Sequence, residues 1–207
     1  MGTDTWPVIH TERKALAADL QALEAGAWAT PSLCEDWTVR DVLAHLTSTA
    51  TLTPAAFFGG LITAGFSSEK AQRNGIAAHL GAAAADTLSG FEAVLTGVTH
   101  PPGPADAWLG ETVVHSEDIR RPLGITYAYP PAVLVQVASF FAGSNKLASA
   151  KRRVGDLALH ATDADWSHGT GLEVRGPVLS LILAMTGREV ADDELDGDGA
   201  WTLRARS

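Results

Sequence analysis

The segment 108–124 constrains the fold of this chain most strongly, because it combines a helical pattern with two ionisable side chains on an apolar face. Glu111 and His115 are four residues apart, about one turn of an α-helix, so both side chains point in one direction. Three further residues share this face: Trp108, Thr112 and Ile119. Ionisable groups are rarely buried without a partner, so an inward Glu–His pair indicates either metal ligands or a buried charge pair.

The overall composition favours one domain, or one main domain with a small appendage. The chain has 207 residues and a formal net charge of −9, which argues against nucleic acid or a membrane surface as its partner. Its apolar stretches are far too short to span a membrane. The lone cysteine, Cys34, excludes an internal disulfide and is compatible with a reducing cytoplasm, where we expect the protein to reside. A homodimer is compatible with these properties.

Apolar periodicity predicts a helical body followed by a mixed tail. Helices are expected over residues 8–24, from Thr38 onward, over 68–97, over 105–121 and over 132–150. Short strands are expected over 157–162, 172–175 and 200–205, with a helix over 178–186 between the last two. This order predicts an α+β arrangement in which residues 1–150 form a helical domain and residues 151–207 form a small lobe.

A Glu-x-x-x-His pair on a helix can supply two metal ligands from successive turns, but its spacing leaves two other interpretations open. The pair can be an intrahelical ion pair, or it can be a buried hydrogen-bonded pair. A third metal ligand would come from another helix, and His45 and His79 both lie within predicted helices. The remaining histidines are expected to be structural: His10, His100, His160 and His168.

Nucleophiles and cationic side chains provide weaker evidence. The chain has no Gly-x-Ser-x-Gly motif, and Cys34 lies beside two acidic residues whose charges disfavour a thiolate. We therefore expect Cys34 to be an ordinary thiol. Arg120 and Arg121 have two interpretations: they complement the C-terminus of a helix, or they bind the carboxylate of a cofactor as an anion clamp.

Two segments resemble the metal-binding segments of a known family. Residues 36–46, Asp-Trp-Thr-Val-Arg-Asp-Val-Leu-Ala-His-Leu, are similar to the segment that carries the first metal ligand in the mycothiol-dependent maleylpyruvate isomerase family, part of the DinB-like superfamily. Residues 109–124 are similar to the segment that carries the other two. Short motifs between residues 157 and 188 also resemble that family, so the resemblance extends from about Thr11 through most of the chain.

The resemblance implies a mainly α fold, a DinB-like four-helix bundle with a small C-terminal α/β (SCP-like) lobe. It implies a divalent metal ion, usually zinc, held by His45, Glu111 and His115, with mycothiol as cosubstrate. The implied function is a metal-dependent, mycothiol-dependent enzyme of the thiol transferase or cis-trans isomerase type. In such an enzyme a zinc-bound thiolate attacks a small electrophilic substrate.

Two other functions remain open at this point. One is a metal-dependent hydrolase that uses metal-bound water, and the other is a non-catalytic helical bundle that binds a partner. The residues by themselves assign no general acid. Asp41, one turn before His45, is a candidate partner for an imidazole N–H, although Thr38 and Asp41 also fit the N-cap and first-turn charge of a helix.

Overall fold

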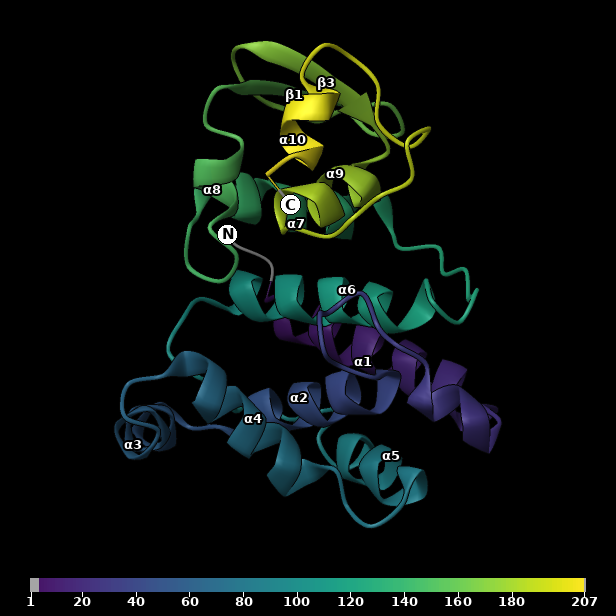
Figure 1. Cartoon of the computed structure of the whole chain (residues 1–207), viewed down its shortest axis with the longest axis vertical. Helices are drawn as coiled ribbons and strands as arrows, with labels where there is room; N and C mark the ends of the chain where they lie inside the picture. The colour runs from purple at the N-terminus through teal and green to yellow at the C-terminus, as the bar shows by residue number, and fades with distance from the viewer. Residues whose placement is uncertain (1–3, 207) are drawn as a thin grey trace. The chain divides into compact units, whose positions relative to one another are not determined.

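The computed structural model describes residues 4–206. Within this range the chain forms ten α-helices, one 3-10 helix and three short strands, which confirms the predicted mainly α fold (Figure 1). It divides into two compact units, the first ending at Thr126 and the second beginning at Tyr127. None of the described helices is long and apolar enough to cross a membrane.

The first unit is a helical bundle centred on α2. Its elements are α1 (Trp6–Gln21), η1 (Ala25–Ala29), α2 (Val39–Thr51), α3 (Pro54–Thr63), α4 (Ser68–His79), α5 (Ala84–Glu92) and α6 (Ala105–Arg120). The helix α2 packs against α4, α5 and α6, and α1 packs against α5 and α6. Buried apolar side chains from these helices form one core: Leu16, Leu20, Trp28, Val42, Leu43, Leu46, Phe91 and Ile119.

Local sequence determines where α2 begins and how closely α4 approaches it. The Thr38 hydroxyl accepts a hydrogen bond from the backbone N–H of Asp41, and the Asp41 carboxylate accepts the Thr38 N–H at 2.9 Å. This capping box confirms the predicted N-cap. Gly75 on α4 lies so close to α2 that a Cβ there would come within 2.4 Å of the Ser48 hydroxyl.

The prediction of a single helix over residues 68–97 is wrong, because this segment forms two helices, α4 and α5. Gly81 adopts φ +66°, a conformation that favours glycine. The Asp86 carboxylate accepts the N–H groups of residues 82 and 83 and begins α5. Arg40 on α2 donates to the carbonyls of Leu80 and Gly81, at 2.8 and 3.0 Å, where α4 ends. The side chain of Arg40, which is distant in sequence, thus donates to carbonyl groups that have no partner within a helix. The helix α3, between Pro54 and Thr63, was not predicted either.

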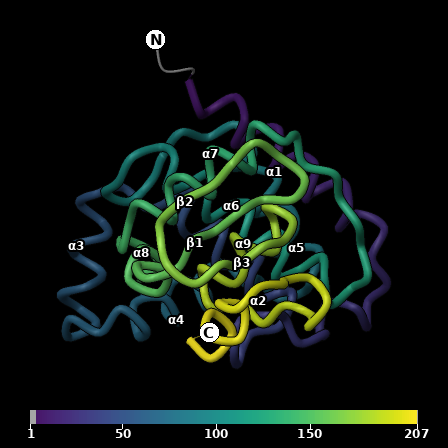
Figure 2. The backbone as a smooth tube through the Cα atoms, turned by 90° about the horizontal axis from the view of Figure 1, so that it is seen from above, coloured from purple at the N-terminus to yellow at the C-terminus, as the bar shows by residue number. Residues whose placement is uncertain are grey.

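The second unit combines helices with a small sheet. Its elements are α7 (Pro131–Gly143), α8 (Ala150–Arg153), β1 (Leu157–Ala161), β2 (Ser167–Gly169), β3 (Leu172–Gly176), α9 (Val178–Met185) and α10 (Ala200–Arg204). The strand order is β2-β1-β3, with β1 antiparallel to β2 and parallel to β3 (Figure 2). The helix α9 packs against β1 and β3 and against α7.

Two predictions for this unit need correction. The fifth helix ends at Gly143 rather than at residue 150, and the strand predicted over 200–205 is the helix α10. In α10 the buried residues are Ala200 and Leu203, while Trp201 is exposed, which is the three-residue spacing of a helix face. Residues 167–169 form the strand β2, which was not predicted.

The division between the two units falls before α7, earlier than the predicted domain boundary at residue 150. The helix α7 buries Val137, Ala138 and Phe141 and packs against α9, so it belongs with the second unit. The assignment of residues 1–150 and 151–207 as domains stays a prediction.

A buried ion pair links α1 to α6. The guanidinium of Arg120 is fully buried, and its Nε and Nη2 atoms lie 2.8 and 2.7 Å from Asp19 Oδ2. Removing the Asp19 carboxylate, which is partly exposed, takes away a negative charge that compensates the buried guanidinium. We predict that Asp19→Ala lowers the free energy of unfolding by about 3 kcal/mol, measured by urea denaturation. As a control, Glu69→Gln in the exposed pair with Arg73 should change it by less than about 0.5 kcal/mol. Equal effects of the two substitutions would contradict the prediction.

A second pair generates a pH dependence in the second unit. Two hydrogen bonds from Arg206, with N···O distances of 2.6 and 2.9 Å, lower the pKa of Asp156. A carboxylate whose pKa is lower in the folded state stabilises the fold above its unfolded pKa, and this contribution disappears as the pH falls through the folded pKa. We predict that Asp156→Asn lowers the urea midpoint at pH 7 and that its difference from the unmodified protein shrinks as the pH falls below the ordinary pKa of an aspartate, about 3.9. The exposed Asp165, substituted to Asn, is the control.

Candidate metal centre

Three side chains from two helices meet in the first unit. His45 lies on α2, and Glu111 and His115 lie one turn apart on α6. His45 Nε2 is 3.3 Å from Glu111 Oε1, and the rings of His45 and His115 are 4.8 Å apart and nearly perpendicular. One potential ligand atom from each residue lies within 4.8 Å of the others. The structure therefore brings together the three residues that the sequence suggested.

The inward direction of the pair on α6 is confirmed. The side chains of Glu111 and His115 are only 11% and 14% exposed. The three residues predicted on the same face are buried: Trp108, Thr112 and Ile119. The Thr112 hydroxyl donates to the Trp108 carbonyl at 2.8 Å, which satisfies a polar atom within the helix.

Glu111 is a buried anion. Burial by itself raises the pKa of this carboxyl, but the neighbouring His45 and His115 side chains outweigh burial and lower it to about 2. Glu111 is therefore ionised at neutral pH and places a negative charge between two imidazoles.

The three residues fit a divalent metal ion. Among the described residues none donates a hydrogen bond of normal geometry to the buried Glu111 Oε1, although His45 Nε2 is only 3.3 Å away. Two nitrogen or oxygen ligands of one tetrahedral zinc ion lie about 3.4 Å apart, so this separation matches a shared ion. Two imidazoles and one carboxylate form a donor set typical of catalytic zinc sites, which keep a further coordination position open.

The loop 30–38 supplies an aromatic cover for this centre. Its Trp37 ring lies 5.0 Å from the His45 ring and 6.4 Å from the His115 ring, measured between centroids. The Ser32 hydroxyl donates to the Trp37 carbonyl at 2.8 Å and closes the turn that holds this tryptophan. No spacing in the sequence indicates that Trp37 contacts the histidines.

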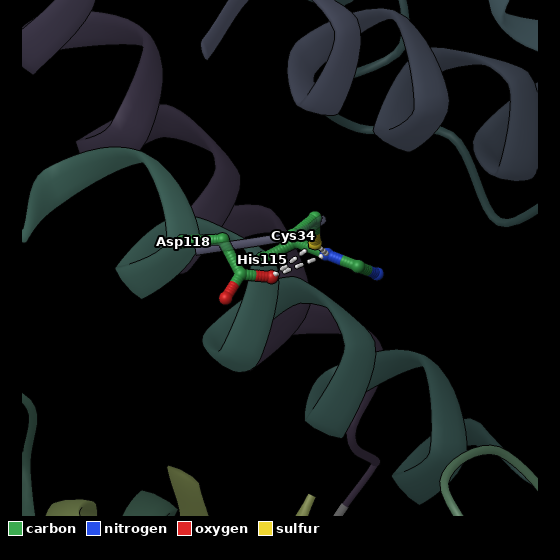
Figure 3. Close-up of side chains that lie close together, drawn as sticks. All are labelled: Cys34, His115 and Asp118. Atoms are coloured by element: carbon green, nitrogen blue, oxygen red, sulfur yellow. Dashed lines mark hydrogen bonds and ion pairs between the residues drawn. The ribbon is translucent and has the colours of Figure 1, made fainter. Parts of the chain in front are cut away.

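Two further polar side chains, Asp118 and Cys34, lie beside His115. Asp118 Oδ2 is 2.8 Å from His115 Nδ1 and accepts a hydrogen bond from Cys34 Sγ at 3.0 Å (Figure 3). Sequence reasoning missed both residues. The three-residue spacing between His115 and Asp118 was an available signal, whereas no signal in the sequence places Cys34 beside His115.

The structure also gives the contacts of the other predicted residues. Asp41 caps α2 through Thr38, so Asp118 rather than Asp41 is the carboxylate beside His115 Nδ1. His79 Nδ1 lies 2.9 Å from the Gly75 carbonyl, and its Nε2 lies 3.2 Å from the Thr51 hydroxyl. The fully buried Arg120 binds Asp19, which gives no support to its interpretation as an anion clamp. Arg121 lies near Glu117, with an N···O distance of 3.4 Å.

Comparison with known families and structures identifies what this helical unit is related to. The family described as the mycothiol maleylpyruvate isomerase N-terminal domain matches residues 9–120. The chain belongs to this family. The matched range reaches the end of α6 and includes all the residues of the candidate metal centre.

Solved structures of this family share the fold over almost the whole chain. The crystal structures of the mycothiol-dependent maleylpyruvate isomerase and of a histidine-to-alanine mutant of it each match with a TM-score of 0.64 and 16% sequence identity. Each match covers 93% of this chain and 91% of the other. At this identity the likeness establishes the fold alone. No curated protein matches the chain significantly.

Proposed function

We propose that this protein is a metal-dependent, mycothiol-dependent enzyme of the thiol transferase or cis-trans isomerase type. The observation that carries the proposal is the convergence of His45, Glu111 and His115 around a buried carboxylate oxygen to which no residue described by the structure donates a hydrogen bond. Membership in the mycothiol maleylpyruvate isomerase family supports mycothiol as the cosubstrate.

In this proposal the three side chains hold a divalent ion, with zinc as the expected metal because two imidazoles and a carboxylate suit it. A bound ion of this kind favours the thiolate form of a coordinated thiol at neutral pH. Glu111 contributes the negative charge that offsets part of the ion's charge, and the histidines contribute neutral nitrogen ligands. Trp37 covers the His45 ring and restricts the access of water on that side.

The reaction class follows from the chemistry of a thiolate. Addition of the thiolate to an activated carbon–carbon double bond forms a C–S bond and leaves a carbanion that is stabilised by the activating group. Rotation about the resulting single bond and loss of the same thiolate give the other geometric isomer. Attack at a carbon that bears a leaving group instead transfers the thiol and expels that group.

A hydrolase that uses metal-activated water is the alternative that retains the metal ion. It shares every ligand with the thiol-dependent enzyme, so the discriminating property is the affinity of the loaded protein for a thiol. A non-catalytic bundle, in which Glu111 is only a partner of the two histidines, requires no metal. These alternatives lead to the two experiments that follow.

The first experiment measures metal content. We predict that the protein purified from zinc-supplemented cells binds about one equivalent of zinc, detected by plasma mass spectrometry. The substitutions His45→Ala, Glu111→Ala and His115→Ala should each lower the content several-fold, because each removes one of three ligands. His79→Ala is the matched control, since His79 is also a helical histidine but its ring nitrogens contact Gly75 and Thr51.

Sub-stoichiometric metal that cannot be restored by reconstitution would overturn the metal-dependent function and favour a non-catalytic bundle. Retention of full metal content in all three alanine variants would show that the ion binds elsewhere.

The second experiment measures thiol binding by the cobalt-substituted protein. We predict that adding mycothiol at millimolar concentration produces a cobalt–thiolate charge-transfer band in the near ultraviolet and raises the melting temperature. Methylated mycothiol, which cannot form a thiolate, should produce no band. A metal-loaded protein that shows no band and no thermal shift would exclude the thiol-dependent enzyme and favour the hydrolase.

A further inference from the structure

A compact group of three side chains lies on the side of His115 where its Nδ1 atom is found. Asp118 Oδ2 is 2.8 Å from His115 Nδ1 and 3.0 Å from Cys34 Sγ, and Sγ is 3.7 Å from Nδ1. Asp118 is fully buried, and Cys34 is half-buried. Figure 3 shows the second ring nitrogen of His115 directed away from both neighbours.

These distances distinguish a group that shares a metal ion from a group that is joined by hydrogen bonds. If a zinc ion were shared by the three residues, its nitrogen and oxygen ligands would lie about 3.4 Å apart, and its sulfur and oxygen ligands about 3.6 Å apart. The observed separations, 2.8 and 3.0 Å, are shorter and match hydrogen bonds. The group is therefore joined by hydrogen bonds to Asp118, and it shares His115 with the set formed by His45, Glu111 and His115.

We infer that Asp118 and Cys34 are positioning residues that fix the tautomer and ring orientation of His115. A carboxylate accepts hydrogen bonds, so the ring proton of a neutral His115 resides on Nδ1. Nε2 then carries the lone pair, on the side of the ring that faces away from Asp118. A carboxylate behind an imidazole also makes it a stronger metal ligand. This inference rests on the proposed function, in which His115 binds the metal.

Cys34 connects the Asp118 carboxylate to the loop 30–38. The buried Asp118 carboxylate needs hydrogen-bond donors, and the Cys34 thiol supplies one to the same oxygen that contacts His115. The backbone reinforces the contact, because the Leu33 N–H donates to the Asp118 carbonyl at 3.2 Å. Cys34 thus attaches the loop to α6 directly beside a proposed metal ligand.

The same loop reaches the other histidine. The Trp37 N–H donates to the Cys34 carbonyl at 3.1 Å, and the Trp37 ring packs on His45. One short turn therefore contacts His115 through Cys34 and Asp118, and His45 through Trp37. A change at Cys34 should alter the geometry around the metal without removing a ligand.

The test compares conservative variants in cobalt- and zinc-loaded protein. Asp118→Asn keeps the size of the side chain but removes the charge, Cys34→Ala removes the thiol, and Cys34→Ser restores a hydrogen-bond donor. Glu35→Gln is the matched control, because Glu35 is an exposed carboxylate in the same loop. Zinc affinity is measured by competition with a chelator, and ligand geometry by the visible absorption bands of the cobalt form.

We expect Asp118→Asn to weaken zinc binding by about 10- to 100-fold, the effect typical of losing such a partner. Cys34→Ala should weaken it less and shift the cobalt bands, Cys34→Ser should return both properties toward those of the unmodified protein, and Glu35→Gln should change neither. Circular dichroism of the metal-free variants verifies that each is folded.

A folded Asp118→Asn variant with unchanged affinity and spectrum would overturn the inference while leaving the proposed function intact. If Asp118→Asn does not fold, the Cys34 pair decides, and identical affinities and spectra for Cys34→Ala and the unmodified protein would overturn the role of the thiol. Failure of the unmodified protein to bind zinc or cobalt would instead overturn the proposed function, and the inference with it.

Discussion

The contact between His45 on α2 and Glu111 on α6 is the interaction on which the candidate centre depends. An ionised carboxylate is costly to bury unless positive charge or hydrogen-bond donors surround it. Here the two imidazoles supply this environment, but they come from different helices. The helices α2 and α6 must therefore keep one relative position. Core packing of apolar residues on both helices, including Leu46 and Ile119, holds that position.

The rest of the first unit supports these two helices. Arg120, at the end of α6, binds Asp19 on α1, and Arg40 on α2 binds the carbonyls where α4 ends. The first contact compensates the charge of a fully buried guanidinium, and the second supplies donors to carbonyls at the end of a helix, so both contacts help to determine where each helix lies. The loop before α2 then places Trp37 and Cys34 beside the histidines. The centre is thus assembled from two parts of the chain that are far apart in the sequence, the loop with α2 and the helix α6.

The second unit has its own apolar core and lies outside the range of the family match. Its small sheet and four helices fold around their own apolar residues, such as Leu159, Val174 and Leu181. The family match ends at residue 120, before this unit begins, whereas the likeness to the solved isomerase structures extends over nearly the whole chain. Family membership therefore bears on the metal centre, and the fold alone relates the second unit to those structures.

The sequence by itself determined the α6 helix, the capping box of α2 and the inward pairing of Glu111 with His115, because each depends on contacts within about four residues. It failed at the break between α4 and α5 and at α10, where Arg40 and the neighbouring strand β3 act from a distance. Periodicity left His45 and His79 equal as a third ligand, and only the family resemblance separated them. The contact of Asp118 with His115 follows from their three-residue spacing on α6. The positions of Cys34 and Trp37 beside the histidines were decided by tertiary structure, since a loop's path over a helix depends on packing that local spacing does not encode.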